Sequence, residues 1–350
     1  GIGAKTSGTV TVSNAVKIDG TTAEVTAALV TGSSKVEATT ALVNMTTAAS
    51  ISEFDAINSE TNGAMTYTIS DTSTNITTAN NADASKFNNS TTLTVTDAAG
   101  TGNNLDLDNA TTATLTAVTV TGDAGADVVQ LSTALTSSNI VTIDFVSDAL
   151  SAVEDKLIFN VTDNSNWITY DNSGNVTSSS TAYTFNKFSN FDLASAEDKF
   201  GVFYDGTATI DFFQEISAST PQPSYRIFDG MVVEDTFHSR GDVLTSAVTS
   251  ATNIRSNIGF FIDTGGTAGQ SGSGTTGIDF TYVTYARSSD TSDPASTQSA
   301  YVYAANYSAV SQSAGNFDAS KLKVVGIAEI VGVTEGDLQA NSYETTNPFA

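Results

Sequence analysis

The sequence predicts an all-β protein, and three observations lead to that class. Only 15% of the 350 residues are charged, and the polar remainder is largely Thr, Ser and Asn interleaved with Ala and Val. Thr and Val are β-branched and fit the pleated, half-buried surface of a sheet. Short runs alternate apolar and polar residues with period two, and turn signals separate them. We expect short-strand solenoid or sandwich units up to about residue 200, followed by an antiparallel β-sandwich-like C-terminal domain with one helix.

The N-terminal part contains several alternating runs and one helix signal. Strands are predicted at residues 8–13, 65–70, 93–96 and 115–121. Asp19-Gly20 and Asn62-Gly63 are typical turn dipeptides between such runs. A short helix is predicted over 52–58, with Ser52 as its N-cap and with Phe54 and Ile57 facing inward.

The last third is richer in aromatic residues and in longer strands. Strands are predicted at residues 200–213, 259–263, 280–285, 300–304 and 322–333. Apolar residues at three- and four-residue spacing predict a helix over 242–258, with Asp242 as its cap. Residues 265–277 are rich in Gly and Ser and are predicted to be a flexible loop.

Proline placement and composition predict the domain organisation. The four prolines are Pro221, Pro223, Pro294 and Pro348, so the first 220 residues contain none. Pro221-Gln222-Pro223 is typical of a stiff connector. We expect a β-rich N-terminal domain over 1–110, a β domain with an internal repeat over 111–220, and a C-terminal domain over 221–350. The chain begins with Gly and not Met, which we interpret as a processed product or a segment of a longer protein.

Charge and cysteine content exclude several classes of protein. The chain carries 38 acidic and 13 basic residues, a formal net charge of −25, and this acidity disfavours a nucleic-acid partner, which requires a cationic face. There is no cysteine, so disulfides, thiol nucleophiles and cysteine-ligated metals are excluded. No run approaches the roughly 20 apolar residues of a membrane span, and the chain is predicted not to span a membrane. An acidic surface suits hard divalent cations.

Acidic motifs recur in the middle of the chain. Residues 122–129 read Gly-Asp-Ala-Gly-Ala-Asp-Val-Val. An aromatic–Asp element is followed by Glu-Asp-Lys twice, with Asp155 and Asp198 aligned 43 residues apart. Each copy is predicted to be a strand, an acidic turn and a second strand.

These motifs resemble those of bacterial RTX-type and S-layer-like proteins secreted by the type I route. The segment 122–129 resembles a calcium nonapeptide, in which Asp and turn carbonyls bind Ca²⁺ between stacked coils. An ordinary loop containing Asp and Gly remains the alternative. The ending, residues 322–343, is also similar to the final strands of such surface proteins. The resemblance implies export by an uncleaved C-terminal signal and an extracellular location. The candidate calcium ligands are Asp123, Asp127, Asp144, Asp155, Asp192 and Asp198.

Catalytic constellations are incomplete in this sequence, and we predict that the chain is not an enzyme. His238 is the sole histidine, and no Gly-x-Ser-x-Gly elbow supplies a nucleophile. Carboxylate pairs for glycoside hydrolysis stay open, because many acidic residues are present. Trp167, the only tryptophan, is predicted to be a core anchor and not part of a sugar platform.

These observations predict an extracellular or cell-surface structural protein that assembles with itself into a layer or filament. Long Thr- and Val-rich strands with few charges are suited to pairing with a neighbour's edge. Cell-surface polysaccharide is a second expected partner. The alternatives are an adhesin or carbohydrate-binding surface module, a phage or viral fibre-type protein, and a secreted polysaccharide-degrading enzyme.

Overall fold

The chain was analysed as a computed structural model of 350 residues. The structure describes residues 5–88, 90–98, 102–109, 117–121, 125–132, 141–145, 153–161, 166–191, 198–204, 225–228, 231–234, 250–264, 278–287, 298–308, 317–333, 344 and 348–349. Strands dominate these residues and few helices accompany them, which confirms the prediction of a largely β fold.

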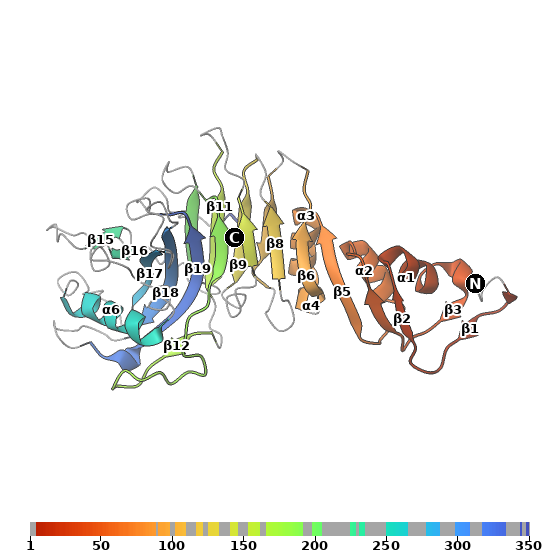
Figure 1. Ribbon diagram of the computed structural model, residues 1–350, viewed down its shortest axis with the longest axis horizontal. Helices are drawn as coiled ribbons and strands as arrows, with labels where there is room; N and C mark the ends of the chain where they lie inside the picture. The colour runs from red at the N-terminus through yellow and green to blue at the C-terminus, as the bar shows by residue number, and fades with distance from the viewer. Residues whose placement is uncertain are drawn as a thin grey trace.

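A long sheet of 13 strands runs through the elongated molecule (Figure 1). Over its first half the strands follow chain order and are parallel to one another. These strands are β2 (Lys17–Gly20), β4 (Leu42–Met45), β5 (Met65–Asp71), β6 (Ser90–Val95), β8 (Ala117–Thr121), β10 (Val141–Asp144) and β13 (Asn186–Ser189). Because parallel neighbours need a crossover, the chain leaves the sheet after each strand and returns beside it.

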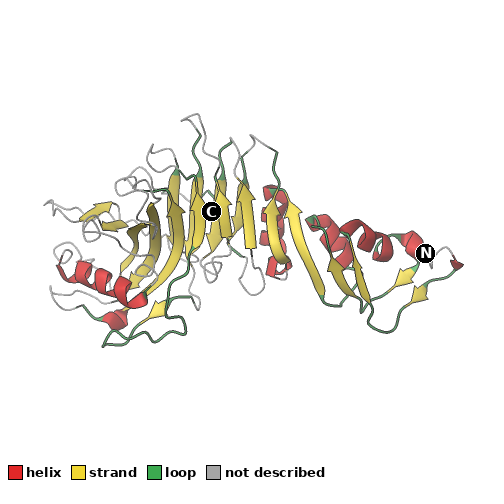
Figure 2. Cartoon of the chain, viewed as in Figure 1, coloured by secondary structure: helices red, strands yellow, loops and turns green. Residues whose placement is uncertain are grey.

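The crossovers form a second layer that changes along the molecule. The first crossovers are helical: α1 (Thr22–Leu29), α2 (Ile51–Asn58), α3 (Ser73–Asp83) and α4 (Ser85–Asn88). The later ones are strands of a short parallel sheet: β7 (Asn104–Leu107), β9 (Val128–Ser132), β11 (Lys156–Val161) and β14 (Lys199–Tyr204). Figure 2 shows this change from helices to strands. We call residues 17–88 the helical turns and residues 90–204 the strand turns.

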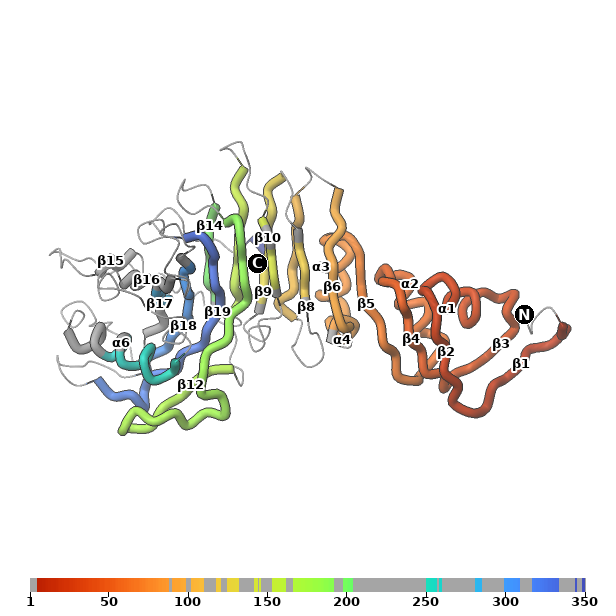
Figure 3. Tube along the Cα trace, viewed as in Figure 1, coloured from red at the N-terminus to blue at the C-terminus, as the bar shows by residue number. Residues whose placement is uncertain are grey.

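One small strand pair lies beside the helical turns, and one pair in the strand turns brings the repeated acidic motif together. The parallel pair β1 (Val10–Thr11) and β3 (Val36–Glu37) lies at one end of the molecule, next to the 3₁₀ turn η2 (Gly32–Ser34) (Figure 3). In the strand turns, β11 and β14 pair with Lys156 opposite Lys199, so the two lysines of the repeated Glu-Asp-Lys motif lie side by side.

The C-terminal strands continue the long sheet. Strand β19 (Leu322–Val331) is parallel to β13. Strand β18 (Gln298–Tyr307) pairs antiparallel with β19, and β17 (Ile278–Arg287) pairs antiparallel with β18. The sheet then ends with β16 (Met231–Glu234) and β15 (Tyr225–Phe228). The smaller elements here are β12 (Ile168–Thr169), which pairs with β19, the helix α6 (Ala251–Thr264) and the 3₁₀ turn η4 (Ala319–Lys321).

The core lies between the two layers and has a second part against the C-terminal strands. In the strand turns the Phe159 ring lies 5.8 Å from the Phe188 ring and 5.5 Å from the Phe200 ring, between ring centroids. Strand β18 is buried on both faces: Val302 packs into the main core, while Tyr303 packs into a cluster that includes residues of α6. Both faces of this part of the sheet are therefore covered.

Several local predictions need correction. The helix at 52–58 is α2, and Phe54 and Ile57 are buried as predicted, but its N-cap is Ser50, which accepts the Glu53 backbone N–H while the Glu53 side chain accepts the Ser50 N–H. Three further helices of the described part, α1, α3 and α4, were not predicted.

The C-terminal helix also differs from the prediction. The described helix begins at Ala251 and not at the predicted residue 242, and Ser250 before it forms an isolated β-bridge. Residues 242–249, including the predicted cap Asp242, lie outside the described residues. Residues 259–263 belong to α6 and not to a strand. A short apolar run fits either element, and here it continues a helix whose preceding residues Ala251, Ile254 and Ile258 are buried at helical spacing.

Candidate metal site

Three of the predicted calcium residues line up at one corner of the strand turns. Asp127, Asp155 and Asp198 each directly precede a strand of the short sheet and are at most 5% exposed. The Asp155 N–H donates to Asp198 Oδ1 at 3.0 Å, and the Asp127 N–H donates to Asp155 Oδ1 at 2.8 Å. Asn103 begins this aspartate ladder, since its backbone N–H donates to Asp127 Oδ1 at 2.6 Å.

The ladder gives these carboxylates a structural role. Each accepts the backbone N–H of the preceding turn, so a buried donor is paired and neighbouring turns are joined. The ladder places its aspartates one per turn and does not gather them around a point. Within the described residues, no group of three or more His, Cys, Asp or Glu side chains could hold a metal ion. Calcium at these residues stays a prediction.

The other predicted ligands are not placed in the ladder. Asp144 ends β10 in the long sheet, where it pairs with Thr121 and Ser189 in the backbone register. Asp123 and Asp192 lie outside the described residues, as do His238, the Pro221–Pro223 connector and the 265–277 loop.

Charged side chains beside the ladder form ion pairs between turns. Glu154 contacts Lys156 at 3.0 Å and Lys199 at 2.6 Å. Lys156 also pairs with the largely buried Glu344, whose hydrogen bond raises the pKa of that lysine. The Glu344 N–H donates to the Phe200 carbonyl, so this residue near the C-terminal end of the chain is tied to β14.

A second acidic group, which the sequence reasoning missed, lies where the helical turns meet the strand turns. We call it the Asp106 cluster: Asp106, Asp108, Asn80, Gln130 and Asn160. Gln130 Nε2 donates to Asp106 Oδ1 at 3.1 Å, and the Asp108 backbone N–H donates to the same oxygen at 3.1 Å. Asn80 and Asn160 donate to the two oxygens of Asp108, each at 3.3 Å.

The Asp106 cluster is buried and electrostatically strained. Asp106, Asn80, Gln130 and Asn160 are each at most 8% exposed. Burial raises the pKa of Asp106 to about 6, and the nearby negative charge of Asp108 adds to the rise. Two carboxyl groups in contact resist double ionisation, so the pair favours one shared proton or one bound cation. The sequence signal was Leu105-Asp106-Leu107-Asp108, which places both acids on one face of a strand.

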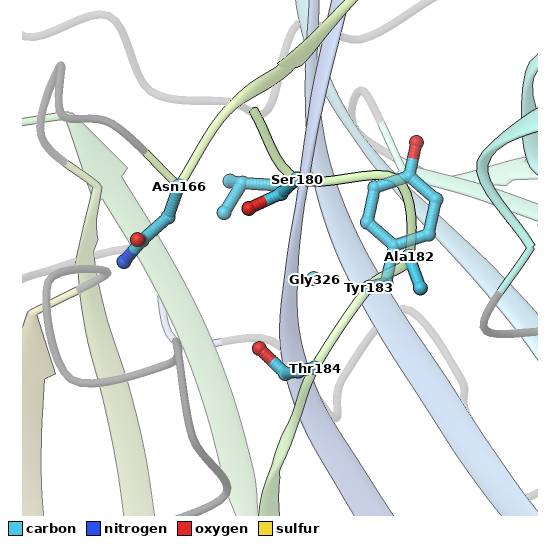
Figure 4. A pocket seen from close by; sticks show the side chains of 7 residues that line it. Asn166, Ser180, Ala182, Tyr183, Thr184 and Gly326 are labelled. Atoms are coloured by element: carbon cyan, nitrogen blue, oxygen red, sulfur yellow. The ribbon is translucent and has the colours of Figure 1, made fainter. Parts of the chain in front are cut away.

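A small cavity adjoins the C-terminal strands (Figure 4). Its volume is about 40 Å³, and Asn166, Ser180, Tyr183 and Thr184 are among the residues that line it. This space suits ordered water and is far below the roughly 300 Å³ of a small-molecule site.

Most aromatic side chains whose burial the structure describes are buried, and Phe203, Phe317 and Phe349 are partly buried. Trp167 is 5% exposed, and Lys323 Nζ lies 4.7 Å from its ring centroid. Among the residues whose burial is described, Leu42 is the only exposed large hydrophobic one, so no exposed aromatic platform occurs in that part of the chain. None of the described helices is both long and apolar enough to cross a membrane.

Comparison with protein-family models, curated proteins and solved structures gave no match. The resemblance to RTX-type and S-layer-like proteins therefore rests on the motifs alone.

Proposed function

We propose that this chain is an extracellular structural protein whose subunits join edge to edge into a filament or surface layer. The observation that carries the proposal is the open edge of β2. This strand ends the 13-stranded sheet and pairs with β4 on one side, and the described residues supply no strand to its other side. At the opposite end β15 is likewise terminal within the described part of the chain.

The two ends differ in sequence, which favours open assembly. Joining β2 of one subunit to the β15 end of another would be a head-to-tail contact, which generates a filament unless the rotation closes a ring. Strands β6 to β14 with their parallel crossovers support a solenoid for the middle of the chain, and the doubly covered β17–β19 region supports a sandwich-like C-terminal unit. Both suit a rod-shaped building block.

The backbone of β2 offers unpaired groups at its edge. The Val16 and Gly20 carbonyls accept N–H groups of Leu42 and Thr46. Because alternate residues of a strand point to opposite neighbours, Lys17 and Asp19 present their N–H and C=O groups to the open side. Their side chains pair with each other at 3.0 Å, which reduces the charge that would repel another strand.

The test uses Asp19→Pro with Asp19→Ala as its matched control. Proline removes an N–H that β4 does not use, so β2 stays paired while strand addition at the edge is blocked. Both variants lose the carboxylate and its 2.9 Å bond from Asn44. We expect the wild type and Asp19→Ala to assemble with rising concentration, and Asp19→Pro to remain smaller, by light scattering and negative-stain microscopy.

Four results would contradict this proposal. A wild-type chain that stays monomeric at high concentration, with and without calcium, would remove its basis. A closed trimer would favour the fibre-type alternative, and glycan binding by a monomer would favour the adhesin. Equal assembly of the two Asp19 variants would move the contact away from β2.

A further inference from the structure

Within the part of the chain that the structure describes, the Asp106 cluster contains no positive charge. The Asp106 side chain is buried and that of Asp108 is half-buried, and their two carboxyl groups interact directly. Within the described residues, no Lys or Arg forms an ion pair with Asp106 or Asp108. The aspartate ladder differs in this respect, because Glu154, Lys156, Lys199 and Glu344 form ion pairs beside it. A buried, uncompensated negative charge is costly, so the cluster favours a binding partner that is positive.

The amide side chains of the cluster also have unused oxygen atoms. Gln130 and Asn80 are each 2% exposed, and both reach the carboxylates through their NH₂ groups. Gln130 Oε1 and Asn80 Oδ1 are buried without a hydrogen-bond partner. A buried carbonyl oxygen without a partner is uncommon in folded proteins. A rotation of each amide by about 180° would exchange its nitrogen and oxygen and direct the oxygen at the carboxylates.

We propose that Asp106, Asp108, Asn80, Gln130 and Asn160 bind one hard divalent cation, with calcium as the fitting ion. The cation neutralises the carboxylate pair and gives the unused amide oxygens a partner. Two carboxylates and three amide oxygens supply the all-oxygen set that calcium takes, at six to eight ligands when both carboxylates chelate or water completes the shell. Magnesium demands a stricter octahedron at about 2.1 Å and is less suited to these long side chains.

The position of the cluster gives the cation a structural role. Asn80 lies on α3, Asp106 on β7, Gln130 on β9 and Asn160 on β11. A bound ion would join the last helical turn to three consecutive strand turns. The inference does not rest on self-assembly, since all ligands come from one chain. It also places calcium away from the six aspartates that the motifs indicated.

The experiment is a calcium titration of the full chain after dialysis against EDTA. The variants are Asp106→Asn combined with Asp108→Asn, and Asp155→Asn as the control in the ladder. We expect the wild type and Asp155→Asn to bind calcium and to melt at higher temperature in its presence. The double variant should lose affinity about 100-fold or more, since even residues that support metal ligands contribute about 10- to 100-fold.

Melting in EDTA provides a second readout that a purely structural pair would not give. Without the ion the two carboxylates repel each other, so the double variant should melt at or above the wild-type temperature in EDTA, and below it in calcium. Unchanged calcium affinity of the double variant, or no binding by the wild type, would overturn the proposal. A double variant that melts well below the wild type in EDTA would also overturn it, because the carboxylates would then be stabilising without a cation.

Discussion

The helical turns and the strand turns share one sheet but secure their second layer differently. In the helical turns, the backbone N–H at the start of a helix donates to an aspartate of the next turn. Ile51 at the start of α2 donates to Asp71, and Ser73 at the start of α3 donates to Asp97, each at 2.9 Å. The ladder of Asn103 and the three aspartates repeats this contact in the strand turns. Both regions therefore join neighbouring turns by hydrogen bonds from a backbone N–H to an aspartate.

The two regions differ in the local hydrogen bonds that support these contacts between turns. Helices α1 and α2 each have a capping box, Thr21 with Glu24 and Ser50 with Glu53, so their first turns are satisfied within four residues. A strand has no such local partner, and its stability depends on the turns above and below. The strand turns should therefore be more sensitive to single changes than the helical turns.

The largest effect should come from the aromatic core of the strand turns. Phe159→Ala removes ring contacts to both Phe188 and Phe200 and should lower the free energy of unfolding by about 3–5 kcal/mol. Phe159→Leu keeps most of the volume and should cost clearly less. Urea denaturation of both variants measures this difference. Equal losses would mean that contacts between rings do not hold the turns together.

A smaller loss should follow from breaking the aspartate ladder. Asp155→Ala leaves the buried Asp127 N–H without its acceptor and should cost about 2–3 kcal/mol. Asp155→Asn keeps a side-chain oxygen that can accept the Asp127 N–H, and should cost less. If both variants unfolded at the same urea concentration as the wild type, the aspartate ladder would not contribute to stability. The claim that the strand turns are more sensitive to single changes would then be wrong.

The sequence predicted strands well and helices and sites only in part. Period-two alternation located β5 and β8 because each buries one face in a continuous layer. Helix α1 was missed although Thr21-Thr22-Ala23-Glu24 is a capping-box sequence, because its Ala- and Thr-rich body has little helical periodicity. The ladder residues were identified, but their role was not, since a carboxylate that binds a neighbouring N–H and one that binds a metal look alike in sequence.

The Asp106 cluster could not be predicted from the sequence for a different reason. Its members come from four elements, and they meet only because α3, β7, β9 and β11 stack in order. No local spacing encodes that stacking. What the sequence did contain was a pair of acids on alternate residues, which in a surface strand would be unremarkable.

The smallest effect tests the local support of the helical turns. Ser50→Ala removes the N-cap of α2 and should lower the free energy of unfolding by about 1 kcal/mol. Ser52, two residues on, is exposed within the helix, and Ser52→Ala should change stability by less than about 0.5 kcal/mol. Urea denaturation of the two variants separates the observed cap from the one that the sequence predicted. A larger loss at Ser52 would reassign the cap, and a loss at Ser50 as large as that of Asp155→Ala would show that the helical turns depend on single contacts as strongly as the strand turns do.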